Sequence, residues 1–121
     1  MITILGIDHV VLRCRDLPRM LAFYRDVLGC PVEADQGGLV QLRAGRSMLD
    51  LVEAGSGPAG RNVDHVCLRV SPFDGEALVR HLRAHGLRPG EVVAHRLGAD
   101  GPGPSLYVDD PEGNTLELKG P

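Results

Sequence analysis

Apolar and polar residues alternate along the chain in an order of segments that occurs twice. Residues 7–14 are rich in Val, Ile and Leu and predict a strand. An apolar stripe at helical spacing follows, with Asp16 as its N-cap and Gly29 as the residue that ends it. Short apolar segments separated by glycines then predict strands near 31–35, 38–43 and 47–53. The first half of the chain therefore predicts a βαβββ module.

The second half repeats this order and some of the residues. We predict a strand at 63–70, a helix at about 74–85, and strands near 90–96, 105–108 and 114–119. Asp8 and His9 recur as Asp64 and His65, at an offset of 56 (65 − 9). Such a duplication predicts an α+β fold with two βαβββ modules that form a curved mixed-sheet cup with the helices outside. We expect one domain over 1–121, with module one at about 4–54, a linker at 55–62 and module two at about 63–119.

The amino-acid composition indicates which kinds of partner and which compartment to expect. The 121 residues are 43% apolar, enough for a buried core, and the formal charge is −3. The basic residues do not cluster with aromatic ones, as they do on many nucleic-acid surfaces, and no apolar run approaches the length of a membrane span. Three cysteines without CxxC spacing are typical of a reducing compartment. We expect a cytoplasmic protein with no nucleic-acid or membrane partner.

Strand alternation places the polar side chains on one face. In the first strand His9 lies opposite an apolar face, and His65 does so in the second copy. The last strand of each half carries one acid, Asp50 and Glu117 respectively. If the modules face each other, two imidazoles and two carboxylates converge, and this set suits a divalent first-row metal. Each residue alone is better explained as a core histidine or a surface acid, but the duplicated positions favour metal ligation.

Several segments together carry a family resemblance. DHVVLRC, FYRDVLG, DHVCLRV and YVDDPEGNTLEL resemble the vicinal oxygen chelate superfamily, which includes glyoxalase I, fosfomycin-resistance thiol transferases, extradiol dioxygenases, methylmalonyl-CoA epimerase and bleomycin-binding proteins. The resemblance implies His9, Asp50, His65 and Glu117 as ligands of one divalent ion, which could be Zn, Ni, Co, Mn or Fe. It also implies a homodimer with ligands drawn from both subunits. Asp50 departs from the glutamate of glyoxalase I, so it could ligate directly, act through a water, or serve as a base.

The resemblance leaves the reaction open. We expect a metal-dependent isomerase or lyase of the glyoxalase type that chelates two oxygens of a small carbonyl or anionic substrate, with Glu117 or Asp50 as the catalytic base. An Fe(II) or Mn(II) extradiol-type dioxygenase is the first alternative, in which Tyr107 would be the acid or base on the wall of the cavity. A fosfomycin-type thiol transferase and a metal-free drug-binding protein of the bleomycin-resistance type are further alternatives.

Two arginines and one loop complete the candidate site. Arg13 and Arg69 occupy equivalent positions on the side of the histidines, so they could bind an anionic group of the substrate or form salt bridges at the rim. Cys67 shares that face but has no basic partner in the sequence to activate it as a nucleophile. The glycine-rich segment before residue 105 predicts a flap over the mouth of the cavity.

Overall fold

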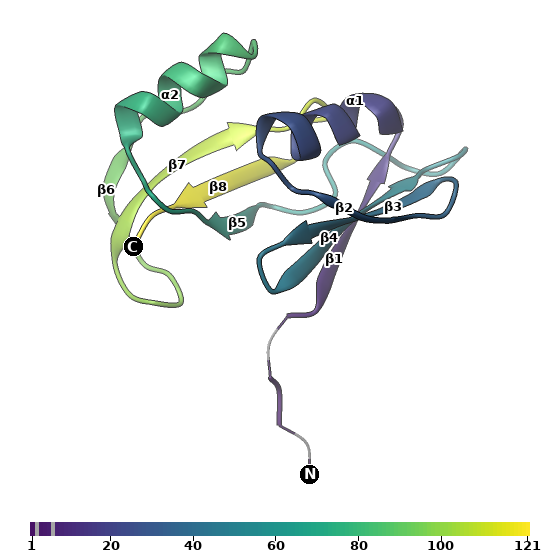
Figure 1. Cartoon of the computed structure of the whole chain (residues 1–121), viewed down its shortest axis with the longest axis horizontal. Coiled ribbons are helices and arrows are strands. Elements are labelled where there is room, and N and C mark those ends of the chain that lie inside the picture. Colours follow the sequence, from purple (N-terminus) through teal and green to yellow (C-terminus); the bar gives the residue numbers. More distant parts are fainter. Residues whose placement is uncertain (2, 6) are drawn as a thin grey trace. The chain divides into compact units, whose positions relative to one another are not determined.

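The computed structural model describes residues 1, 3–5 and 7–121, and Figure 1 shows its helices and strands in the predicted order. The first half contains β1 (His9–Cys14), α1 (Leu17–Leu21), η1 (Ala22–Val27), β2 (Val32–Asp35), β3 (Leu39–Ala44) and β4 (Ser47–Glu53). The second half contains β5 (Val66–Arg69), α2 (Gly75–Ala84), β6 (Val93–Arg96), β7 (Gly103–Asp109) and β8 (Thr115–Lys119). None of the described helices is long and apolar enough to cross a membrane.

The chain divides into two compact units, Met1–Gly60 and Arg61–Pro121, which we call unit 1 and unit 2. Each unit holds one four-stranded mixed sheet, with strand order β1-β4-β3-β2 in unit 1 and β5-β8-β7-β6 in unit 2. In both units the first strand runs parallel to the last, and the other neighbours are antiparallel. The prediction of an α+β fold with two βαβββ modules is confirmed.

The core of unit 1 lies on the helix side of its sheet. Leu12 and Cys14 of β1 are buried there, whereas His9, Val11 and Arg13 are exposed, as strand alternation predicts. Neighbouring strands and the helix supply the other buried apolar side chains, namely Met20, Phe23, Tyr24, Val40, Leu42, Leu49 and Leu51. The opposite face of the sheet is left for polar groups.

The helix of unit 1 differs from the regular α-helix that the sequence predicts. It begins as expected, with Asp16 accepting a hydrogen bond from the backbone N–H of Arg19 over 3.0 Å. From Ala22 it widens into a π-helix, in which Leu28 N–H bonds the carbonyl of Phe23, five residues earlier. Phe23 and the adjacent Tyr24 are both buried, with their rings 4.8 Å apart edge to face. Apolar spacing alone does not reveal this local change of pitch.

Unit 2 follows the same plan with shorter strands at its start. Its core lies on the side of α2 and contains Leu82, Leu106, Val108, Leu116 and Leu118. β5 begins at residue 66 rather than 63, because the guanidinium of Arg61 bonds the carbonyls of Val63 and Asp64, which are then not free to extend the strand. His65 therefore lies immediately before β5. β6 likewise begins at 93 rather than 90.

The turn before β8 is fixed by buried polar side chains. Asp110 accepts hydrogen bonds from the backbone N–H groups of Glu112 and Asn114 and from the Asn114 amide. Asn114 in turn accepts one from the backbone N–H of Asn62, 2.7 Å away. The DPEGN segment therefore joins the start of unit 2 to the strand that carries Glu117.

Candidate functional site

The two candidate carboxylates occupy equivalent positions in the two sheets. Asp50 in β4 is the cross-strand partner of Val11 in β1 and of Gln41 in β3. Glu117 in β8 is the partner of Cys67 in β5 and of Tyr107 in β7. Both side chains lie on the face away from the helix, and both are buried, at 3% and 6% exposure. The repeat seen in the sequence is therefore also a repeat of strand register.

Each candidate histidine is held by the aspartate that precedes it. Nδ1 of His9 lies 2.7 Å from Asp8 Oδ1, and Nδ1 of His65 lies 2.6 Å from Asp64 Oδ2. The bond to Asp8 raises the pKa of His9, and the charge of Asp50 raises it further. A carboxylate on one ring nitrogen of a metal-binding histidine fixes the ring and leaves the other nitrogen free to ligate. The repeated Asp-His pair supplies this arrangement in both units.

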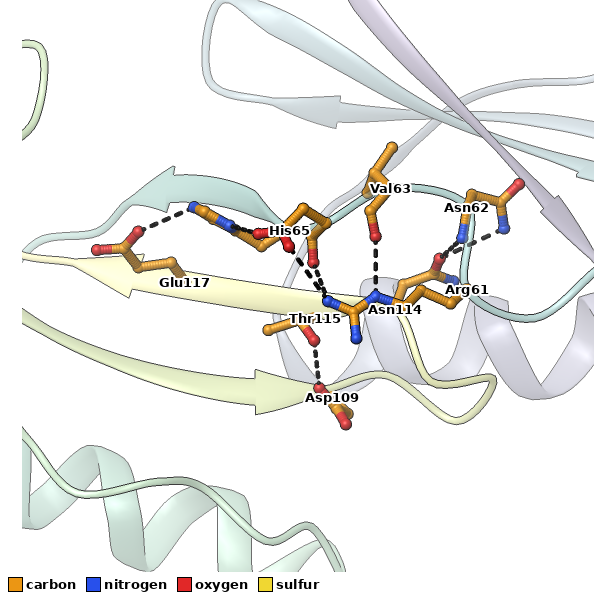
Figure 2. Close-up of polar contacts among 9 residues, drawn as sticks. Arg61, Asn62, Val63, His65, Asp109, Asn114, Thr115 and Glu117 are labelled. Atoms are coloured by element: carbon orange, nitrogen blue, oxygen red, sulfur yellow. Dashed lines mark hydrogen bonds and ion pairs between the residues drawn. The ribbon is translucent and has the colours of Figure 1, made fainter.

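In unit 2 the imidazole and the carboxylate meet directly. Figure 2 shows His65 pointing along the sheet toward Glu117, with 3.4 Å between Nε2 and Oε2. The other oxygen, Oε1, is buried and has no hydrogen-bond partner among the described residues. Partial burial raises the pKa of the neighbouring Cys67 thiol, and the Glu117 charge raises it further. Burial and the same charge also raise the pKa of Tyr107, whose ring lies edge to face with His65 at 5.7 Å.

In unit 1 the carboxylate has a neutral neighbour instead. The side-chain amide of Gln41 donates a hydrogen bond to Asp50 Oδ2 over 3.2 Å. Oδ1 is buried, and no described group bonds it. One oxygen of Asp50 is thus held by a hydrogen bond, and the other has no hydrogen-bond donor among the described residues.

These residues fit a divalent metal ion. A buried carboxylate oxygen without a donor is costly unless a cation or a proton compensates it, and both sheets contain one such oxygen. The imidazoles are oriented through Nδ1, which leaves Nε2 as the nitrogen that could bind a metal. No group of three or more potential ligand side chains gathers within the described residues. Each unit by itself therefore offers one imidazole and one carboxylate, which is half of the predicted ligand set.

A cavity of about 280 Å³ adjoins the His65–Glu117 pair within unit 2. Its wall combines the ends of β5 and β8 with the glycine-rich loop before β7. The lining residues are His65, Cys67, Arg69, Leu97, Gly98, Ala99, Asp100, Glu117, Lys119, Gly120 and Pro121. The loop predicted as a flap thus forms one side of the cavity.

The predicted substrate-binding residues differ in their surroundings. Arg69 lines the cavity and forms an ion pair with Asp100 of the loop, 2.9 Å away. Tyr107 lies beside Glu117 on the neighbouring strand, and the guanidinium carbon of Arg96 is 5.7 Å from the centre of the Tyr107 ring. Arg13 is exposed on β1 of unit 1. A substrate role for these three side chains stays a prediction.

Some residues of the site were not identified from the sequence. Asp8 and Asp64 could have been, because each repeats directly before a histidine. Gln41 carried no such signal, since only strand register brings it opposite Asp50. Lys119 is the one lysine of the sequence and lies two residues after Glu117, yet only the cavity reveals what surrounds it.

Comparison with known proteins places the chain in a family. The model of the glyoxalase/bleomycin resistance protein/dioxygenase superfamily matches residues 6–118. The glyoxalase domain-containing protein RDO1 of Mycosarcoma maydis is 30% identical over 97% of this chain and 69% of its own length. An integron cassette protein from V. cholerae superposes with a TM-score of 0.82 and 28% identity, over 99% of this chain and 98% of that one.

A lactoylglutathione lyase from Agrobacterium tumefaciens has the same fold. Its TM-score is 0.73 at 24% identity, over 98% of this chain and 95% of that one. The match of the family model covers nearly the whole chain, both βαβββ units included. The chain therefore belongs to the glyoxalase/bleomycin resistance protein/dioxygenase superfamily.

Proposed function

We propose that this protein is a metal-dependent enzyme of the glyoxalase-like type, an isomerase or lyase acting on a small carbonyl or anionic substrate. The observation that carries the proposal is the repeated pair of a buried carboxylate and an aspartate-oriented imidazole. In each pair one carboxylate oxygen lacks a hydrogen-bond partner among the described residues. A binding protein for apolar drugs has no need for such groups, because burying them without a partner costs free energy.

His9 and Asp50 together with His65 and Glu117 would hold one divalent ion. The ion would act as a Lewis acid toward two oxygens of the substrate. Two carboxylates balance its charge, so the buried site is formally neutral. We further propose that the protein is a homodimer in which unit 1 of one subunit and unit 2 of its partner supply the ligands of each site.

The two carboxylates have different roles. The amide of Gln41 holds Oδ2 of Asp50, so Asp50 serves as a fixed ligand. Glu117 lies beside His65, with 3.4 Å between Oε2 and Nε2, and its side chain is one methylene longer than that of Asp50. Glu117 is therefore the residue that takes a proton from the substrate carbon at Oε1 and returns it. Substrate-binding roles belong to Arg69, Tyr107 and Arg13.

Metal titration of the full-length chain tests the ligand assignment. Zn(II), Co(II), Ni(II), Mn(II) and Fe(II) are offered in turn, and about one ion per chain is expected to bind. The variants His9→Ala and Glu117→Ala should each lose the ion, whereas His95→Ala, on an exposed residue of β6, should keep it. Unchanged stoichiometry in both ligand variants would reject the assignment.

Mixing two inactive variants tests the shared site. A subunit with His9→Ala retains its unit 2 ligands, and one with Glu117→Ala retains its unit 1 ligands. After random exchange, half of the dimers are mixed and each has one intact site of two, so binding should recover to about a quarter of the wild-type level. Sites that use both units of one chain would show no recovery, and that result contradicts the shared site.

A further inference from the structure

Lys119 is a buried cation that forms no ion pair with a carboxylate of the described residues. It is 7% exposed, and its ammonium donates hydrogen bonds to the carbonyls of Gly101 at 3.0 Å and Gly120 at 3.3 Å. Among the described residues, no carboxylate oxygen lies within 4.0 Å of Nζ. These two hydrogen bonds engage two of the three ammonium protons, so one proton remains available as a donor. A buried ammonium is costly unless it is paired, so a bound anion is expected.

The glycine-rich loop packs closely against the side chain of Lys119. A Cβ at Gly98 would lie 2.7 Å from Lys119 Cε, and a Cβ at Gly103 would lie 2.9 Å from Nζ. At Gly103 it would also lie 2.6 Å from the carbonyl oxygen of Gly120. The loop can approach Lys119 this closely only because both positions lack a side chain. The glycines thus position the lysine at the cavity and do not themselves bind.

The charges around the cavity show what kind of anion fits. Arg69 is already paired with Asp100, and the Glu117 carboxylate faces His65. Lys119 is left with one positive charge and one free donor. A carboxylate carries one negative charge on two acceptor oxygens, whereas a phosphate at neutral pH carries a greater charge and more acceptor oxygens. The balance favours a monocarboxylate.

The spacing of the strand limits the size of the ligand. Glu117 and Lys119 are two residues apart on β8 and share one face, so they are separated by about 7 Å along the strand. The same two-residue spacing occurs on β5, because Cys67 is opposite Glu117 and Arg69 is opposite Lys119. A volume of about 280 Å³ is small for a ligand site. It suits a molecule of a few carbon atoms.

We propose that the cavity of unit 2 binds a small monocarboxylate through the ammonium of Lys119, with the oxygens on the adjacent carbons directed toward His65 and Glu117. The role given to the oxygens near His65 and Glu117 rests on the proposed function. The proposal names the substrate class as short oxo or hydroxy acids, and excludes bulky thiol adducts. The cavity residue that sets this preference is Lys119.

Since the sequence has one lysine, labelling with ¹⁵N-lysine gives a single side-chain ammonium signal, that of Lys119. Pyruvate is titrated into the full-length chain, with and without one equivalent of Zn(II), and pyruvamide serves as the uncharged analogue. Pyruvate should shift the signal to saturation, whereas pyruvamide should bind at least tenfold more weakly because it lacks the charge. Equal binding of the two compounds, or tighter binding of inorganic phosphate than of pyruvate, would overturn the proposal.

Calorimetry on variants adds a second measurement. Lys119→Met should weaken pyruvate binding about ten- to a hundredfold. Arg83→Met removes one positive charge from an exposed position of α2 and should leave the affinity unchanged. An unchanged affinity of Lys119→Met for pyruvate would contradict the proposal. If that variant does not fold, the comparison of pyruvate with pyruvamide on the wild-type chain decides alone.

The metal measurements separate this inference from the proposed function. Lys119→Met should still bind one metal ion per chain, because its side chain is not a ligand. A chain that binds pyruvate at Lys119 but takes up no metal would refute the proposed function and leave the carboxylate site in place. A chain that takes up metal but does not distinguish pyruvate from pyruvamide would refute this inference only.

Discussion

Gln41 donates a hydrogen bond to Asp50 across neighbouring strands, 3.2 Å from amide nitrogen to Oδ2. Asp50 is 3% exposed, and its other oxygen has no described partner, so the bond from Gln41 is what compensates this buried carboxylate among the described residues. Replacing Gln41 by Met keeps the length of the side chain and removes the donor. In metal-free protein we expect a loss of about 1–3 kcal/mol in the free energy of unfolding, measured with urea.

Gln36→Met is the matched control, because Gln36 is exposed. Its effect should stay within about 0.5 kcal/mol. Equal losses in both variants would show that the amide of Gln41 does not stabilise Asp50. If the metal assignment is correct, saturating metal should reduce the loss in Gln41→Met, since the ion then compensates the carboxylate.

The assignment of the base predicts unequal effects at the two carboxylates. Glu117→Gln keeps the shape and one oxygen donor but removes the basicity, so turnover should fall by about a hundredfold or more while less metal affinity is lost. Asp50→Asn should affect metal binding more than the chemical step. Turnover is measured over a panel of small oxo and hydroxy carbonyl compounds with metal restored. Activity that survives Glu117→Gln but not Asp50→Asn would reverse the two roles.

The thiol of Cys67 reports on the charge of Glu117. Cys14 and Cys30 are buried and Cys67 is exposed, so one thiol per chain should react with iodoacetamide before the other two. Partial burial and the Glu117 carboxylate raise the pKa of Cys67, which leaves less thiolate at a given pH. The rate should therefore still be rising above pH 8.5, and Glu117→Gln should increase it severalfold at pH 8. Glu91→Gln, at an exposed residue of unit 2 outside the cavity, is the control and should leave the rate unchanged.

Exposed apolar side chains lie directly before β1. Ile4, Leu5 and Ile7 expose 85%, 97% and 74% of their surface, which is unusual for a chain in isolation. We predict a homodimer with a mass near twice 13.0 kDa in sedimentation velocity, and the double variant Leu5→Glu, Ile7→Glu should shift it toward the monomer. A wild-type monomer at micromolar concentration that still binds metal would contradict both the dimer and the shared site.

Much of the fold follows from the order of residues. The βαβββ pattern, the N-cap Asp16 and the glycine that ends the first helix are local features, so alternation and capping rules predict them. The helix of unit 1 is the exception. Its π-turn brings the adjacent Phe23 and Tyr24 into the core together, and no rule of spacing shows which pitch the packed rings require.

The sequence by itself determined the duplication and the residue types of the candidate site. Asp8-His9 and Asp64-His65 recur because the module recurs, and strand alternation places each histidine away from the apolar face. Tertiary structure decided what each carboxylate contacts, since register sets Gln41 beside Asp50, and Cys67 and Tyr107 beside Glu117. It also decided that Lys119 is buried, because the loop that covers it is distant in sequence and folds back over β8 through its glycines. Burial and partner depend on long-range packing, which the pattern along a strand does not encode.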